Sequence, residues 1–189
     1  IENREEYEGI KRNFINFDNN DISFFALATS LQKNYCTSEL RKTVLEEVLS
    51  GIEGQVIVFV KYIDSIPKDE KRVIGDMNEK ERRDVIEQFK KNKFKTLYMT
   101  YGCGSFGLNM QNCKNIVFAD HTFDYAQRLQ AEARIYRLGQ ESDVDYYNLE
   151  CNCGLERLIL SCLDKKVRLL DEIKNEIERN GKEEWLKTI

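Results

Sequence analysis

The stretch QVIVFV, at residues 55–60, decides the fold class. It is a short, continuous run rich in β-branched residues, which is typical of a strand buried on both faces of a parallel sheet. Four more short runs predict strands: RVI (72–74), TLYMT (96–100), NIVFA (115–119) and VDYYNL (144–149). Helical patterns at about 79–91 and 124–137 separate several of them. This alternation predicts an α/β fold with a mainly parallel sheet of five to six strands flanked by helices, and such sheets bind ligands beyond the carboxyl ends of their strands.

Helices are expected at both ends of the chain. Apolar residues recur at helical spacing through residues 1–50, which predicts a helical segment leading into the sheet. The same spacing over about 153–179 predicts one long helix that braces the domain from the C-terminal side. We therefore divide the chain into a helical lead-in (1–50), a sheet core (51–152) and a C-terminal bracing helix (153–189).

The composition limits the classes of protein to consider. The chain has 189 residues, 41% hydrophobic and 33% charged, and no apolar run approaches the roughly 18 residues that span a membrane. It begins with Ile1 and an acidic stretch rather than a signal peptide, so we expect a piece of a longer soluble protein that is cytoplasmic, or nuclear in a eukaryote. The six cysteines are expected to be reduced. With a single histidine, His121, which we interpret as a loop residue, no metal site is expected.

The charge is unevenly distributed along the sequence. The net charge of -4 taken alone argues against nucleic-acid binding, but residues 61–95 carry 11 basic and 8 acidic side chains, a local charge of +3. A cluster of lysines over 90–95 could attract phosphates or could simply cover a solvated helix end.

The stretch TYGCGSFGLNM, residues 100–110, carries three glycines directly after a predicted strand. Glycine permits left-handed backbone angles and lets main-chain N–H groups approach an anion closely. A tight packing turn explains the same pattern equally well. It is not the GxxxxGK[ST] phosphate loop, which occurs nowhere in the chain.

The stretch QAEARIYRLGQ, residues 130–140, places Arg134 and Arg137 three residues apart. On a helix, side chains at this spacing point the same way. Two permanently charged guanidinium groups on one face suit a phosphate whose charge grows during transfer. A pair of surface salt bridges, to Glu132 or Glu141, is the alternative.

Taken together in this order, the motifs resemble those of the second RecA-like lobe of superfamily-two helicases, and most of all its Swi/Snf-type DNA translocases. Two motifs of that family carry the resemblance, STxAGGxGxNL and QAxxRxxRxGQ. The residues that match them are Thr100, Gly104, Gly107, Asn109, Gln130, Ala131, Arg134, Arg137, Gly139 and Gln140. The likeness covers roughly residues 38–170.

The resemblance implies a lobe that closes on a first RecA-like lobe of the same chain, with ATP and Mg²⁺ held mainly by that first lobe. It implies that Arg134 and Arg137 are catalytic and reach the γ-phosphate, while Gly107, Asn109 and Gln130 line the ATP cleft. It further implies that Lys61, Thr100 and Tyr101 contact the backbone of double-stranded DNA. The isolated chain is then expected to be inactive, because it holds only half of the site.

Two alternatives stay open on the sequence. One is the motor of a restriction or repair helicase, which uses the same arginines on another nucleic acid. The other is a degenerate RecA-like lobe that serves only as a scaffold for binding nucleic acid or protein. A scaffold gains nothing from both guanidinium groups in register, so the arginine pair favours a motor.

Overall fold

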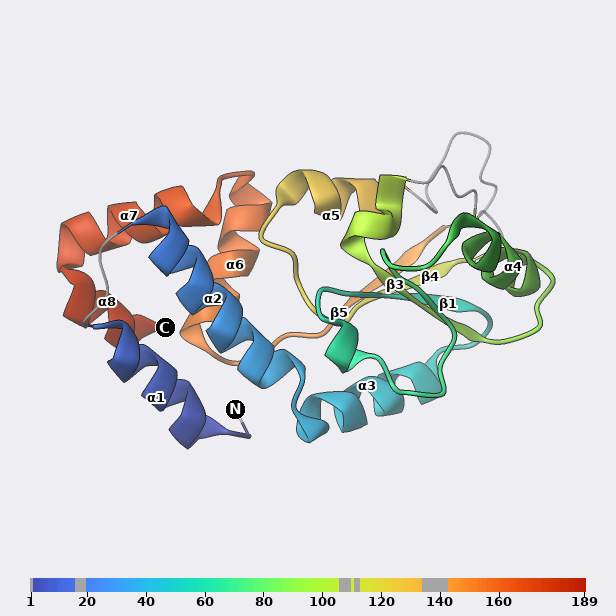
Figure 1. The fold of residues 1–189 in the computed structure, drawn as a ribbon, viewed down its shortest axis with the longest axis horizontal. Helices are drawn as coiled ribbons and strands as arrows, with labels where there is room; N and C mark the ends of the chain where they lie inside the picture. The colour runs from blue at the N-terminus through green and yellow to red at the C-terminus, as the bar shows by residue number, and fades with distance from the viewer. Residues whose placement is uncertain (1, 16–19, 106–109, 111–112, 134–142) are drawn as a thin grey trace. The chain divides into compact units, whose positions relative to one another are not determined.

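The computed structural model describes residues 2–15, 20–105, 110, 113–133 and 143–189. The chain divides into two compact units (Figure 1). A sheet unit comprises Lys42–Thr122 and Ala126–Leu149, and a helical unit comprises Ile1–Arg41, Phe123–Tyr125 and Glu150–Ile189.

The sheet unit contains the predicted α/β alternation. Its strands are β1 (Val56–Val60), β2 (Arg72–Val73), β3 (Thr96–Thr100), β4 (Asn115–Phe118) and β5 (Asp145–Asn148). Its helices are most of α3 (Glu39–Gly51), α4 (Glu79–Lys90), nearly all of α5 (Tyr125–Glu132) and two short 3₁₀ turns, η1 (Ile63–Ser65) and η2 (Tyr101–Ser105). Every strand lies within one of the predicted runs, so the fold class is confirmed.

The five strands form one parallel sheet in the order β2-β3-β1-β4-β5. The QVIVFV run supplies the central strand β1, all five of whose residues are buried. Burial on both faces explains why this run is continuously apolar rather than alternating.

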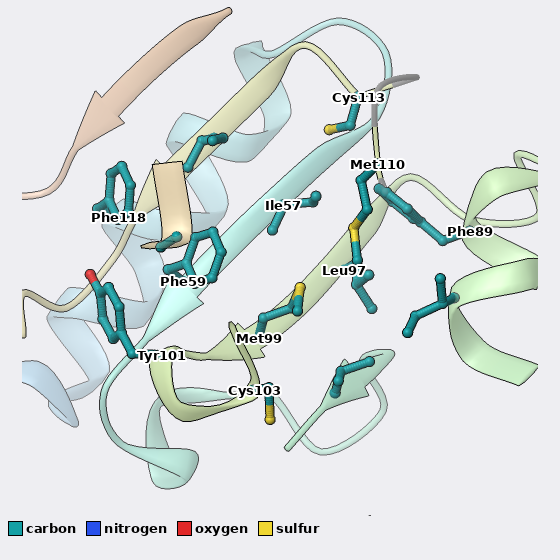
Figure 2. Packing of buried hydrophobic residues seen from close by; sticks show 14 residues of the cluster. Ile57, Phe59, Phe89, Leu97, Met99, Tyr101, Cys103, Met110, Cys113 and Phe118 are labelled. Carbon is teal, nitrogen blue, oxygen red and sulfur yellow. The ribbon is translucent and has the colours of Figure 1, made fainter. Parts of the chain in front are cut away.

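The two faces of the sheet have separate hydrophobic cores. On one face, Ile57 and Phe59 of β1 pack in a cluster with Ile86 and Phe89 of α4 and with Ala131 of α5 (Figure 2). On the other face, the remaining β1 side chains pack with Leu45 and Leu49 of α3, among others. The α4 helix lies within the predicted range of about 79–91, and the Asn78 side chain caps its start by accepting a hydrogen bond from the Glu81 backbone N–H at 2.9 Å.

The helical unit contains α1 (Arg4–Phe14), α2 (Asp21–Cys36), α6 (Gly154–Lys165), α7 (Leu169–Asn180) and α8 (Lys182–Thr188). Its core is built from large side chains, including Tyr7, Phe24 and Trp185, each at most 2% exposed. Helix α1 packs on α2, and α2 packs on both α6 and α7. Residues near the two ends of the chain therefore share one core.

The expectation of one long C-terminal helix is wrong, because two sharp turns divide the segment into α6, α7 and α8. Lys166 adopts the left-handed conformation (φ 59°) and ends α6. The N–H groups of Lys166 and Val167 then donate to the carbonyls of Leu163 and Cys162, which completes a Schellman cap. Gly181, at φ 81°, ends α7 in a conformation that glycine adopts without strain.

All six cysteines are free thiols, as expected. No helix in the part of the chain that the structure describes is both long and apolar enough to cross a lipid bilayer.

Candidate functional site

The strand register places two predicted DNA contacts side by side at the carboxyl edge of the sheet. Val60, the last residue of β1, pairs with Thr100, the last residue of β3. Lys61 directly follows Val60, so Lys61, Thr100 and Tyr101 all lie where the two central strands end. This is the edge at which parallel α/β sheets bind ligands.

Asp120 connects the ends of β1, β3 and β4 at this edge through hydrogen bonds. It lies two residues beyond β4 and is fully buried. Its Oδ2 accepts hydrogen bonds from the backbone N–H groups of Lys61 at 3.1 Å and Tyr62 at 3.4 Å. Its own backbone carbonyl accepts a hydrogen bond from the Tyr101 hydroxyl at 2.7 Å. Asp120 therefore fixes the backbone from which the Lys61 side chain extends.

The side chains of the three predicted DNA contacts differ in accessibility. Lys61 is partly exposed, and its ammonium group lies 5.3 Å from the centre of the Tyr62 ring. Thr100 is also partly exposed, and its hydroxyl lies 3.2 Å from the Cys103 sulfur. Both can reach a ligand at the edge of the sheet.

Tyr101, in contrast, is buried with a relative exposure of 4%. Its ring stacks on Phe59 at 5.5 Å and on Phe118 at 6.3 Å between ring centroids (Figure 2). Because both the ring and the hydroxyl are engaged inside the unit, a phosphate could meet only the main chain at this position. The side chain supports the edge of the sheet instead.

Arg128 fastens helix α5 to the sheet. Its guanidinium carbon lies 3.3 Å from the centre of the Phe118 ring in β4, a cation–π contact. The same group donates to the Asn148 side chain of β5 at 2.9 Å and to Glu132 at 2.7 Å. The sequence gives no local signal for this role, because Phe118 and Asn148 are distant from Arg128 along the chain.

His121 completes the attachment of α5. The ring is fully buried, with Nε2 at 3.0 Å from the Leu149 carbonyl and Nδ1 at 3.3 Å from Arg128. Since a carbonyl only accepts, Nε2 carries the proton and Nδ1 accepts from the guanidinium. The histidine thus links the end of β5 to Arg128 through a neutral ring.

The remaining predicted site residues lie on or after α5 and in the glycine stretch. Gln130 is exposed on α5, which ends at Glu132, two residues before Arg134. The described helix is shorter than the predicted range 124–137, whose final residues fall outside the description. The residues Gly107, Asn109, Arg134 and Arg137 also lie outside the described part of the chain.

A family model matches residues 39–139, more than half of the chain, and it represents the helicase conserved C-terminal domain. The chain belongs to this family. The matched segment contains the whole sheet except β5, together with both edge residues, Lys61 and Thr100. The resemblance to the second lobe of Swi/Snf-type helicases is confirmed.

Individual relatives support this membership. DNA repair protein rad5 of Neurospora crassa is 31% identical over 96 residues, covering 50% of this chain and 8% of rad5. An uncharacterized ATP-dependent helicase, YqhH of Bacillus subtilis, is 26% identical over 178 residues, covering 82% of this chain and 31% of YqhH. The chain thus spans less than a third of either relative.

The fold is shared with solved structures. The SWI2/SNF2 ATPase core domain of Sulfolobus solfataricus superposes with a TM-score of 0.71 at 19% identity. The match covers 94% of this chain and 45% of that one. The RecA-like architecture of the sheet unit is therefore shown by both sequence family and structure.

Proposed function

We propose that the chain is the second motor lobe of an ATP-dependent DNA translocase. In this role Arg134 and Arg137 act on the γ-phosphate of an ATP molecule that a first lobe holds, and Lys61 and Thr100 grip the backbone of double-stranded DNA. Gly107, Asn109 and Gln130 line the cleft between the lobes. The ATP-dependent helicase that is related over 178 residues supports the ATPase part of the proposal.

The observation that carries the proposal is the anchoring of α5 by Arg128. Arg128 holds this helix on β4 and β5 through an aromatic ring, an amide and a histidine. Both arginines follow this anchored helix directly in the sequence. Stabilisation of developing charge depends on groups that are held in place before the reaction.

The two arginines would act by electrostatics alone. During phosphoryl transfer, negative charge develops on the transferred group, and guanidinium groups stabilise it without giving up a proton. Arginine fingers of this kind contribute roughly 10³ to 10⁵ in rate. The chain's share of catalysis is therefore charge stabilisation and positioning.

Clustered metal ligands are absent from the part of the chain that the structure describes. Among the described residues, no group of three or more His, Cys, Asp or Glu side chains is arranged to hold a metal ion. The Oδ2 atom of Asp120, the buried carboxylate at the edge, faces two backbone N–H groups. In the proposed function, the first lobe holds Mg²⁺ together with ATP.

Lys61→Ala tests the DNA side of the proposal. In the full-length protein, we expect a several-fold weaker affinity for duplex DNA and a salt dependence reduced by about one counterion, as for the loss of one phosphate contact. The kcat at saturating DNA should be retained. Binding titrations at two salt concentrations on two unrelated duplexes measure both effects.

Lys114→Ala is the matched control for this variant. Lys114 is exposed and directly precedes β4, so it lies at the opposite, amino-terminal edge of the sheet. The Lys114→Ala variant should bind duplex DNA with the same affinity as the unaltered protein. Equal losses in the two variants, or a strong sequence preference with a flat response to salt, would contradict a phosphate grip at the carboxyl edge.

A further inference from the structure

Two cysteines lie one residue apart in a turn at the start of helix α6. Cys151 and Cys153 are separated only by Asn152, and the Cys153 backbone N–H donates to the Cys151 carbonyl at 2.8 Å. This closed turn keeps the two Cα atoms within the roughly 7 Å that a disulfide can span.

The two thiols are not equivalent. Cys153 is the N-cap residue of α6 and is 6% exposed, whereas Cys151 is partly exposed. The interaction with Cys151 lowers the pKa of Cys153, with a smaller contribution from the backbone at Glu156, while burial opposes the shift. The same interaction, followed by burial, raises the pKa of Cys151. Cys153 is thus the more acidic thiol of the pair.

The other buried thiols differ from Cys153. Burial raises the pKa of Cys113 and of Cys162 to about 11 each. Since the thiolate is the reactive form, a thiol of this kind is nearly inert at neutral pH. Cys153 therefore differs from Cys113 and Cys162 in the direction of its pKa shift, although all three side chains are buried.

The surroundings hold the turn in place. A Cβ atom at Gly154 would lie 1.7 Å from the Thr188 carbonyl oxygen, so the C-terminal residues press directly on the backbone that follows Cys153. The Tyr7 hydroxyl donates to the Ile189 carbonyl at 2.9 Å and closes the other side. This packing restricts the backbone directly after Cys153.

We propose that Cys151 and Cys153 form a thiol modification site that a small hydroperoxide converts to an intramolecular disulfide. The Cys153 thiolate attacks the peroxide oxygen, the O–O bond breaks, and a sulfenic acid and one water or alcohol form. The Cys151 sulfur then attacks the sulfenic sulfur, loses its proton and releases water. Two thiols are oxidised to one disulfide while one hydroperoxide is reduced.

Peptide mapping of the chain after treatment with hydrogen peroxide tests this site. Trypsin releases residues 138–157 as one peptide in which Cys151 and Cys153 are the two cysteines. We expect this peptide to lose two hydrogen atoms and to resist alkylation by iodoacetamide until a reductant is added. In the untreated chain at pH 7, Cys153 should be alkylated at least about tenfold faster than Cys162, as its lower pKa requires.

Three variants separate the two steps. Cys151→Ser should keep the reactive Cys153, because a hydroxyl also donates, but it should stop at a sulfenic acid that dimedone traps. Cys153→Ser should lose both the fast alkylation and the disulfide while keeping a good N-cap residue. Cys162→Ser is the matched control and should behave like the unaltered chain. The proposal is overturned if peroxide leaves peptide 138–157 open to alkylation, or if it yields only disulfides between chains.

Discussion

Replacing Arg134 or Arg137 by alanine in the full-length protein is expected to lower the DNA-stimulated kcat at least about 10²-fold. Each change removes a fixed positive charge from the developing negative charge of the transferred phosphoryl group. The affinity for DNA should barely change, because the proposed DNA contacts are Lys61 and Thr100 on the strand ends. Steady-state ATP turnover with DNA varied at saturating ATP measures kcat and DNA affinity together.

Arg83→Ala serves as the control for charge removal in the same unit. Arg83 lies on α4 with 75% of its side chain exposed and pairs with Glu79 one turn earlier, so its loss should leave both parameters unchanged. The assignment is wrong if the Arg134 and Arg137 variants lose DNA binding but hydrolyse ATP normally once DNA is saturating. The arginine pair would then be a clamp on DNA phosphates.

Glu156→Ala is expected to lower the free energy of unfolding of the helical unit by about 3–5 kcal/mol, the usual cost of removing one partner of a buried ion pair. Glu156 is fully buried, accepts a hydrogen bond from the Tyr35 hydroxyl and lies 3.7 Å from the Arg41 guanidinium. Burial, and then the charge of Glu156, raises the pKa of Tyr35 well above its ordinary value. Without the carboxylate, a buried hydroxyl and a nearly buried guanidinium lose their shared partner.

Urea unfolding followed by tryptophan fluorescence measures this change. Trp185 is the single tryptophan of the chain and is buried in the helical unit, so its emission reports on that unit. Glu156→Gln keeps an acceptor for Tyr35 and should cost less than Glu156→Ala. Glu178→Ala, at an exposed position on α7, should stay within about 0.5 kcal/mol. A loss for Glu156→Ala no larger than that of the Glu178 variant would show that the buried pair does not hold the unit together.

The strands could be predicted from the sequence because a strand buried on both faces appears as a short, continuous run of apolar residues. Residues 55–60 had to be apolar throughout to fill both faces of the sheet, and the observed β1 falls inside this run. The start of α4 also depends on a local interaction, because the Asn78 side chain accepts a hydrogen bond from the backbone N–H three residues later. The helical patterns and the strand runs together were sufficient to predict the fold class.

The division of the C-terminal helix could not be predicted, because the residue that ends α6 is a lysine. Lys166 adopts a left-handed angle that a sequence pattern associates with glycine or asparagine. The apolar spacing also continues across the break, since Ile159 and Leu169 are both buried in the same unit. Because α6 and α7 bury their apolar residues in the same core, the sequence pattern resembles that of one continuous helix.

The site was predictable only in part. The glycine and arginine motifs pointed to the correct family, and the register brought Lys61 next to Thr100 as the parallel sheet requires. The burial of Tyr101 and the anchoring role of Arg128 depend on Phe118, which is 17 residues from one and 10 from the other. Contacts of this kind follow from the tertiary fold and leave no local pattern.

In the proposed function, this chain supplies half of an ATPase site. The most direct test is steady-state ATP turnover, with saturating duplex DNA, by the purified 189-residue chain beside the same chain joined to its first lobe. We expect the isolated chain to be indistinguishable from a blank and the joined protein to hydrolyse ATP in a manner that requires DNA. Turnover by the isolated chain that Arg137→Ala abolishes would contradict the claim, and so would a joined protein that binds DNA but hydrolyses no ATP.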